Sequence, residues 1–274
     1  MSILKIVANA LVEDIGAGDI TTRAIIPHDL KGKAKIWAKH ELVLSGLEPA
    51  RLAFLLVDHR NNFEPKAKEG QRLVKGDNIA IVSGFVKSLL TAERVALNFL
   101  QRMSGIATLT SEYVKRIEGT KAKIADTRKT APGLRETDKM AVRAGGGINH
   151  RMGLFDAVLI KDNHIIAAGG VYKAVRKVKE LVYDSAKVEV EVKNIEELKE
   201  AIKAGADIVM LDNMDISTIR EAVEITARKS LLEASGNISL ENVREVALTG
   251  VDIISVGKLT HSAPSADIAM DIIE

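Results

Sequence analysis

Alternating hydrophobic and polar residues characterise the first part of the chain. Residues 31–86 alternate small or apolar side chains with polar ones, which predicts short antiparallel strands. Glycine-containing turn signals at residues 69–70 and 75–77 separate these strands. Apolar residues at helical spacing predict a helix over residues 3–11 and a much longer one over residues 88–117. We therefore expect a strand-rich region with helices on either side.

The pattern changes after residue 120 to a repeated strand and helix. Six short strand candidates are the segments KAKIAD, FDAVLIKD, KVEVEV, ADIVMLD, LLEAS and VDIISVG, and most of the gaps between them have a helical pattern. Strands and helices that alternate at this spacing form parallel βα units. A seventh strand is expected near residues 141–147. Six or more such units favour an α/β barrel, with an open doubly wound sheet as the competing topology.

Composition restricts the chemistry that this chain can use. The 274 residues are 46% hydrophobic and 28% charged, and the net charge of +2 gives no overall attraction to nucleic acid or to membranes. Cysteine is absent, which excludes disulfides, thiolate catalysis and cysteine-ligated metal. Residues 1–19 lack the features of a signal peptide, and no apolar run approaches the roughly 20 residues of a membrane span. We expect a cytoplasmic protein.

Polar or glycine-rich residues follow five of the predicted strands where each strand ends. These segments are residues 126–129, 161–164, 212–213, 235–237 and 257–258. The carboxyl ends of barrel strands form one face of the barrel, and that face carries the active site. A solvated loop or a helix cap explains any one of these strand ends, but it does not explain five together. We therefore expect a polar site at this mouth.

Glu189 and Glu191 lie two residues apart in KVEVEV, so they face the same side of a strand. The valines beside them suit the helix-facing side, which leaves both carboxylates in the barrel interior. An unpaired charge is costly there, so the carboxylates must meet a metal ion, Lys161 or an arginine. The alternatives are a buried structural ion pair and a functional carboxylate pair that Asp212 joins.

A basic cluster accompanies these acids at the same mouth. Its members are Arg128, Lys129, His150, Arg151 and Lys161. Lysine and arginine match carboxylate and phosphate groups, whereas carboxylates suit Mg²⁺ or the hydroxyls of a ribose. Glycine-rich strand ends let backbone N–H groups approach a phosphate closely. The combination indicates a phosphorylated sugar and a carboxylated co-substrate.

Several segments spread over nearly the whole chain resemble the quinolinate phosphoribosyltransferase family, also called decarboxylating nicotinate-nucleotide pyrophosphorylases. They are VEDIGAGDITT, TAERVALNFLQRMSGIAT, DTRKTAPGLR, AGGGINHRMGLFDAVLIKDNH, VEVEV, GADIVMLDNM, EASGNIS and GVDIISVGKLTHS. The resemblance implies an N-terminal α/β sandwich domain, residues 1–105, and an incomplete, seven-stranded α/β barrel, residues 106–274, whose final helix returns to the first domain. It also implies a homodimer in which each N-terminal domain caps the partner's barrel, and it leaves open a hexamer made of three dimers.

The implied reaction joins quinolinate to phosphoribosyl pyrophosphate (PRPP) in the presence of Mg²⁺. Its products are nicotinate mononucleotide, pyrophosphate and CO₂, and the reaction belongs to NAD biosynthesis. Two rival functions remain open at this point. A related phosphoribosyltransferase with another acceptor, such as the molybdenum-associated homologues, shares much of the barrel signature. Lys161 at a strand end also suits a Schiff-base aldolase.

The resemblance also implies a role for each site residue. Quinolinate would be bound by Thr127, Arg128, Lys129, His150 and Arg151, with Arg94 reaching in from the partner subunit. Lys161 would face the phosphoribosyl group, and Glu191 and Asp212 would hold the ribose hydroxyls and Mg²⁺. The 5′-phosphate would be cradled by Ser235, Gly236, Asn237, Val256, Gly257 and Lys258. The family commonly has glycine at position 237 and a small residue at position 258.

Three further polar residues have open interpretations. Arg135 and Lys139 lie at near-helical spacing, so each is either an anion contact or part of a solvated helix face. We expect the solvated face for Lys139, and both alternatives stay open for Arg135. His164 either contacts phosphate or caps a helix.

Overall fold

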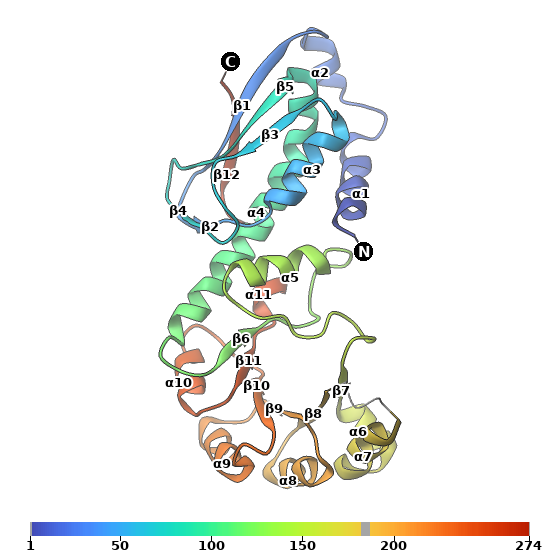
Figure 1. Ribbon diagram of the computed structural model, residues 1–274, viewed down its shortest axis with the longest axis vertical. Coiled ribbons are helices and arrows are strands. Elements are labelled where there is room, and N and C mark those ends of the chain that lie inside the picture. The colour runs from blue at the N-terminus through green and yellow to red at the C-terminus, as the bar shows by residue number, and fades with distance from the viewer. Residues whose placement is uncertain (1, 182–186, 274) are drawn as a thin grey trace. The chain divides into compact units, whose positions relative to one another are not determined.

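A four-stranded antiparallel sheet organises the first of two units in the chain (Figure 1). The computed structural model describes residues 2–181 and 187–273. The sheet has the order β12-β1-β5-β3, with β1 (Lys31–Ala38), β3 (Asn62–Pro65), β5 (Asn78–Phe85) and β12 (Ile268–Ile272), and a small separate sheet pairs β2 (Leu42–Val43) with β4 (Arg72–Leu73). In β1, Ala34, Ile36 and Ala38 are buried, which confirms the predicted alternation.

The helices of this unit include one that the alternating pattern did not predict. They are α1 (Ile3–Ile15), α2 (Ile20–Ile25), α3 (Leu47–Val57), α5 (Arg135–Ala144) and most of α4 (Val86–Arg116). The predictions of α1 and α4 are confirmed. The strand-like interpretation of residues 31–86 is wrong for α3, because Ala50, Ala53 and Phe54 form one buried helical stripe there.

The end of the chain is a strand, and the expected final helix is wrong. β12 pairs antiparallel with β1, where Met270 lies opposite Ile36. Ile268 and Met270 are buried while Asp267 and Asp271 are exposed, which is a period of two and therefore strand geometry. The first unit consists of residues 1–111, 130–146 and 259–274. It is therefore built from three stretches of the chain, whereas the expected division had one boundary, after residue 105.

Helix α5 contributes a buried charge network to the first unit. Arg102 donates two hydrogen bonds of 2.8 Å to the carboxylate of Asp138, which has no exposed surface. Lys139 has no exposed surface either, so the expected solvated face for this residue is wrong. The reason is that residues 137–139 face the interior of the unit as a continuous buried segment. The Arg135 Nε donates to Thr130 Oγ1 at 3.1 Å.

The second unit is built around a six-stranded parallel sheet. It comprises residues 112–129 and 147–258, and its strand order is β6-β11-β10-β9-β8-β7. The strands are β6 (Lys123–Ala125), β7 (Val158–Ile160), β8 (Val188–Val192), β9 (Ile208–Asp212), β10 (Leu231–Ser235) and β11 (Ile253–Ser255). All six strand predictions are confirmed. The helices are α6 (Asp162–Ala168), α7 (Val171–Leu181), α8 (Ile195–Ala204), α9 (Ile216–Thr226) and α10 (Val243–Leu248), and the short α11 (Lys258–His261) begins at the end of this unit.

The helices alternate with the strands, and α7, α8 and α9 lie along one face of the sheet (Figure 1). The other face of each central strand therefore points into the interior of the unit. The expected seventh strand is not at residues 141–147, because most of that segment belongs to α5. A single parallel bridge between Ala125 and Ile148 occupies this place beside β6. The arrangement is consistent with the expected incomplete barrel.

None of the helices in the described part of the chain has both the length and the apolar character needed to cross a bilayer.

Candidate functional site

The carboxyl ends of the parallel strands surround one cavity of about 230 Å³. The strand register explains this convergence, because Ser235 at the end of β10 lies opposite both Asp212 on β9 and Ser255 on β11. Nine residues that the sequence singled out line the cavity: Thr127, Arg128, Lys129, His150, Arg151, Lys161, Glu191, Asp212 and Ser235. Four further lining residues were not predicted: Leu159, Met210, Glu233 and Ser255.

Six predicted site residues do not line this cavity. They are Arg94, Gly236, Asn237, Val256, Gly257 and Lys258. Arg94 is exposed on α4 in the first unit. Gly236 and Asn237 continue the loop that begins at Ser235, and Lys258 is exposed where α11 begins. His164 caps α6, since its Nδ1 accepts a hydrogen bond from the Lys161 backbone N–H at 3.0 Å.

One wall of the cavity is basic. Burial lowers the pKa of the Arg151 guanidinium, and the nearby positive charge of Arg128 lowers it further. A partly buried guanidinium that has a second positive charge beside it favours an anion at this wall. The loop that carries this wall is held by the buried Asp126, whose Oδ1 accepts from the His150 backbone N–H at 2.9 Å.

Two carboxylates, Glu191 and Asp212, line the same cavity. Glu191 lies 3.9 Å from the Lys161 ammonium, measured from Oε2 to Nζ. Burial raises the pKa of Glu191, and the negative charge of Asp212 raises it further, while Lys161 opposes both effects. A buried carboxylate whose charge is disfavoured by a neighbouring carboxylate forms with it a site that a divalent cation would stabilise. Glu191 and Asp212 are therefore a chemically suitable pair for Mg²⁺.

His150, Glu189 and Glu233 form a buried cluster, and two of them, His150 and Glu233, line the cavity. The His150 Nε2 lies 3.1 Å from a Glu189 carboxylate oxygen and 3.7 Å from one of Glu233. The sequence suggested a metal ion, Lys161 or an arginine as the partner. Glu189 meets a histidine, and its charge also acts on the Arg151 guanidinium. The Arg151 backbone N–H donates to His150 Nδ1 at 2.8 Å, so the neutral ring carries its proton on Nε2 and donates it to Glu189.

This tautomer argues against a metal ion in the cluster. The potential ligand atoms of the three residues lie within 4.8 Å of one another. A metal ion at Nε2 would require the proton to move to Nδ1, where the Arg151 N–H already donates. The arrangement therefore binds protons. Burial, followed by the negative charge of Glu189, raises the pKa of Glu233 to about 8.

Sequence reasoning missed Glu233, although a signal was present. Glu233 is the one charged residue of the strand segment LLEAS, and it is only 1% exposed. An acid in the middle of an otherwise apolar parallel strand must face a polar interior or a partner. The same argument that placed Glu189 in the interior applies to Glu233.

The Ser235-Gly236-Asn237 loop has a left-handed backbone at its last two residues. Gly236 has a φ of 99° and Asn237 a φ of 51°, a conformation that asparagine tolerates. Asn213, at the end of the neighbouring strand, has a φ of 54°. Its side chain packs against Gly236, where an added Cβ would lie 2.2 Å from Asn213 Oδ1.

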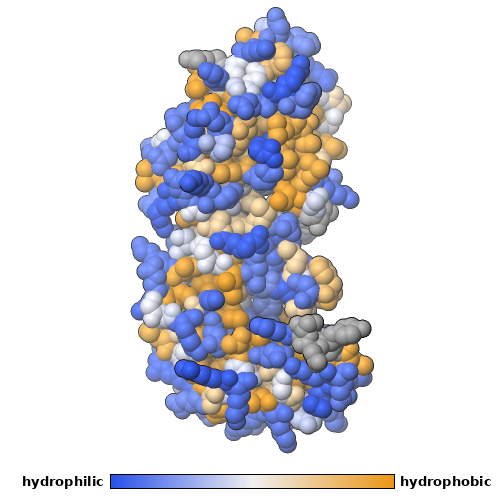
Figure 2. All heavy atoms as spheres, in the orientation of Figure 1, coloured by the Kyte–Doolittle hydropathy of each residue, from blue (hydrophilic) through white to orange (hydrophobic). Residues whose placement is uncertain are grey.

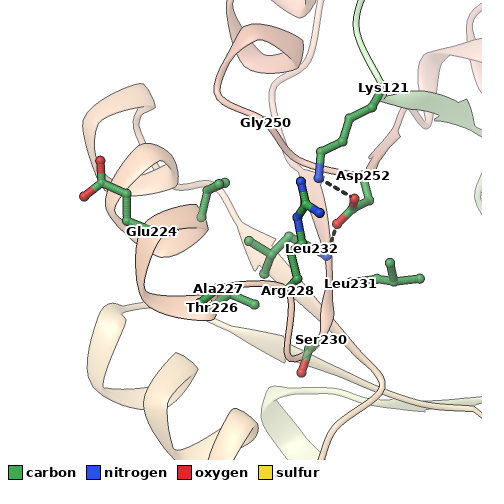
Figure 3. A pocket seen from close by; sticks show the side chains of 11 residues that line it. Lys121, Glu224, Thr226, Ala227, Arg228, Ser230, Leu231, Leu232, Gly250 and Asp252 are labelled. Carbon is green, nitrogen blue, oxygen red and sulfur yellow. Dashed lines mark hydrogen bonds and ion pairs between the residues drawn. The ribbon is translucent and has the colours of Figure 1, made fainter.

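A larger hollow, of about 750 Å³, lies at the opposite ends of the strands (Figure 3). Lys121 and Asp252 form an ion pair of 2.6 Å there, and the other Asp252 oxygen accepts from the Leu232 backbone N–H at 2.9 Å. Figure 3 shows the Arg228 side chain directed toward this pair. The hollow lies at the amino end of β10, and this face of a barrel serves stability rather than catalysis. We therefore assign the candidate site to the smaller cavity.

Comparisons with known proteins cover both units. The family description "Quinolinate phosphoribosyl transferase, N-terminal domain" matches residues 19–104, and its counterpart for the C-terminal domain matches residues 106–271. A Bacillus subtilis protein named "Probable nicotinate-nucleotide pyrophosphorylase [carboxylating]" is 43% identical over 272 residues, which cover 99% of this chain and 94% of that protein. A Nicotiana tabacum relative, "Quinolinate phosphoribosyltransferase [decarboxylating] 2b, mitochondrial", is 45% identical over 96% of this chain and 80% of its own.

Solved structures agree with these relatives. The nicotinate-nucleotide pyrophosphorylase of Francisella tularensis matches with a TM-score of 0.93 and 43% identity, and the match covers 99% of this chain and 96% of that one. The Ehrlichia chaffeensis enzyme of the same name matches with a TM-score of 0.95 and 40% identity, over 100% and 99% of the two chains. The chain therefore belongs to the quinolinate phosphoribosyltransferase family.

Proposed function

We propose that this protein is a quinolinate phosphoribosyltransferase, a pentosyltransferase of NAD biosynthesis. It converts quinolinate and PRPP into nicotinate mononucleotide, pyrophosphate and CO₂. The observation that carries the proposal is a single cavity at the strand ends that is lined by both a basic wall and a carboxylate pair. The basic wall suits a dianionic ring, and the carboxylate pair suits a ribose that develops positive charge. Relatives that share more than 40% identity have names describing this activity.

Quinolinate is assigned to the basic wall. Arg128, Lys129 and Arg151 would bind its two carboxylates, and the His150 ring would lie beneath them. Arginine can bind a carboxylate through two parallel hydrogen bonds, so it fixes both the position and the plane of the ring. Thr127 supports this wall, since its Oγ1 accepts from the Lys129 backbone N–H at 3.0 Å.

PRPP is assigned to the carboxylate pair and to the neighbouring loops. Glu191 and Asp212 would hold the ribose hydroxyls and Mg²⁺, which fits the raised pKa of Glu191 beside the charge of Asp212. Mg²⁺ would there stabilise the negative charge of the leaving pyrophosphate. Lys161 would contribute a second cation near that group. The 5′-phosphate would be held by backbone N–H groups of two loops, at residues 235–237 and 256–258.

The chain's own residues then perform two tasks. The nitrogen of the pyridine ring attacks the anomeric carbon of the ribose as the bond to pyrophosphate breaks, so the protein supplies no nucleophile. Glu191 and Asp212 stabilise the positive charge that develops on the ribose. Holding the two anions at bonding distance contributes up to about 7–11 kcal/mol in well-oriented cases. The ring nitrogen is then cationic and stabilises the electron pair that stays on the adjacent ring carbon when its carboxylate leaves as CO₂; a proton from solvent then binds to that carbon and completes the product.

A homodimer with shared active sites is part of the proposal. Apolar residues of the first two helices are exposed, among them Val12 (75%), Ile20 (84%) and Ile25 (70%). Figure 2 shows hydrophobic surface on the part of the first unit where α1 and α3 lie. Such surface suits a partner subunit, from which Arg94 would reach the quinolinate. A hexamer of three dimers and a cytoplasmic location stay predictions.

A turnover assay of the purified protein tests the proposed function. PRPP and Mg²⁺ are supplied with either quinolinate or nicotinate, and nicotinate mononucleotide and CO₂ are followed. Product from quinolinate alone, with release of CO₂, is expected, and a chelator should abolish it until Mg²⁺ is restored. Absence of product from either acid would overturn the proposal and favour a related enzyme with a different acceptor. Labelling of Lys161 by borohydride in the presence of a carbonyl substrate would instead favour an aldolase.

A further inference from the structure

A chain of side-chain amides connects Asp212 to the loop that follows β10. The Asn213 Nδ2 donates to Asp212 Oδ1 at 3.0 Å, and the Asn237 Nδ2 donates to Asn213 Oδ1, also at 3.0 Å. The backbone supports this link, since the Asn213 N–H donates to the Ser235 carbonyl at 2.8 Å. Two separate strand ends are thus joined through a single asparagine side chain.

The far end of the chain is anchored as well. The Asn242 Nδ2 donates to the Asn237 carbonyl at 3.0 Å, and Asn242 Oδ1 accepts from the Ser239 backbone N–H at 2.8 Å. These bonds close the loop between β10 and α10 on itself. Asn237 therefore has a held backbone carbonyl and a side chain that reaches across to β9.

The direction in which each amide nitrogen and oxygen point determines which group the hydrogen bonds stabilise. Asn213 can donate to the Asp212 carboxylate only when its own oxygen points the other way. The Asn237 amide donates to that oxygen, so it stabilises this orientation and disfavours a flipped amide, which would bring two oxygens together. The left-handed backbone at both asparagines and the absence of a Cβ at Gly236 make room for this arrangement.

We propose that Asn213 is the positioning residue of Asp212, and that Asn237 fixes the orientation of Asn213. The inference rests on the proposed function, in which Asp212 holds the ribose and residues 235–237 hold the 5′-phosphate of the same PRPP molecule. The two contacts with PRPP then belong to one hydrogen-bonded unit. A glycine at position 237 could not make this bond, so the link to the loop depends on the Asn237 side chain.

Three variants test the proposal: Asn213→Gly, Asn237→Gly and the double variant. Glycine suits both positions, because each has a positive φ and only the amide is removed. Asn213→Gly should lower kcat/KM for PRPP about tenfold, the lower end for a hydrogen bond to a charged group, and Asn237→Gly should lower it about threefold. The kcat/KM of the double variant should be no lower than that of Asn213→Gly, because the Asn237 side chain acts only through Asn213 and the backbone N–H of residue 237 is kept. KM for quinolinate should stay near the wild-type value in all three variants.

A binding measurement without turnover accompanies the kinetics. Ribose 5-phosphate contains both the ribose hydroxyls and the 5′-phosphate. Calorimetric titration with it should rank the variants in the same order by affinity, and the double variant should bind no more weakly than Asn213→Gly. Asn194→Ala is the matched control, since Asn194 caps α8 by accepting from the Glu197 N–H at 2.9 Å and has no contact with Asp212. Its kcat/KM for PRPP should not change.

Losses that multiply in the double variant, or an unchanged Asn213→Gly, would overturn the inference while leaving the proposed function intact. A wild-type protein that does not turn over quinolinate would overturn the proposed function instead. Thermal midpoints of all variants identify any loss that comes from unfolding. In that case the ribose 5-phosphate titration at a temperature below the transition still decides between coupled and independent effects.

Discussion

The carboxylate of Glu233 on β10 lies 3.7 Å from the Nε2 atom of His150, across the interior of the second unit. Glu189 lies closer to the same atom, so two buried acids face one imidazole. The folded protein therefore holds a proton on Glu233 with a pKa of about 8, far above the ordinary value of 4.5. The contribution of this group to stability is fully present below about pH 4.5 and is lost as the pH rises through about 8.

Glu233→Gln should remove this pH dependence, because glutamine keeps the neutral shape and cannot ionise. We expect the thermal midpoint of the variant to rise relative to that of the wild type between about pH 5 and about pH 8.5. Glu48→Gln is the control with the opposite sign, since hydrogen bonding to Arg51 lowers the pKa of Glu48. Identical pH profiles for wild type and Glu233→Gln would contradict the protonated state of Glu233.

Arg128→Ala and Arg151→Ala should each raise KM for quinolinate about 30- to 100-fold, because a charge-assisted contact to a carboxylate is lost from a partly buried site. KM for PRPP should change much less. Steady-state kinetics with each substrate varied in turn provide the measurement. Lys121→Ala, at the opposite ends of the strands, removes an equal charge and should leave both constants unchanged. Normal quinolinate kinetics in either arginine variant would show that the basic wall is not the acceptor site.

Glu191→Gln should lower kcat about 10²- to 10³-fold, because a charge that stabilises the transition state is lost while the side chain keeps its size. KM for quinolinate should stay close to the wild-type value, since Glu191 faces Lys161 rather than the arginines. Glu196→Gln on α8 is a suitable control because it changes the same charge outside the cavity. A change confined to KM for quinolinate would place Glu191 on the acceptor side.

Asp138→Ala should destabilise the protein by about 2–4 kcal/mol, because the fully buried carboxylate accepts two hydrogen bonds from Arg102. It also accepts from the Ala131 backbone N–H at 3.2 Å. Urea denaturation provides the free energy of unfolding. Glu48→Ala breaks a half-exposed pair with Arg51 of the same 2.8 Å length and should cost at most about 1 kcal/mol. Equal costs for the two variants would refute a structural role for the Asp138 pair.

Mixing Arg94→Ala with Lys161→Ala should restore activity if active sites are shared between subunits. Each variant alone has no intact site, but a mixed dimer has one site built from the two unmutated residues. Random exchange of subunits should therefore recover up to about a quarter of the wild-type activity. The assay is turnover after the two inactive proteins are incubated together. Absence of any recovery, with exchange shown by a mass-tagged subunit, would mean that Arg94 serves its own subunit.

Much of the second unit followed from local sequence patterns. A strand of five residues such as β8 shows its period within its own length, and the polar residue that ends it comes next in the chain. The prediction that Glu189 and Glu191 share a face needed only the geometry of one strand. Asparagine at position 237 likewise suits the left-handed backbone found there, which has a φ of 51°.

Other features depended on partners far away in the sequence. β12 is a strand because β1 pairs with it, more than 200 positions earlier in the chain. The interior location of Lys139 depends on what α5 packs against, which helical spacing alone does not reveal. α3 was not predicted because helical spacing is a weak signal in so short a helix, and the segments around it alternate as strands do.

Local patterns were sufficient to predict the βα order, the parallel strands and the chemical character of their ends, because these depend on neighbouring residues. Which groups meet became known from the three-dimensional structure: Glu189 with His150, Glu191 with Lys161, and Asn213 with Asn237. These pairings depend on the register and twist of strands that are far apart in the chain. A pairing of charges or amides is a property of three-dimensional distance, which no local pattern along the chain contains.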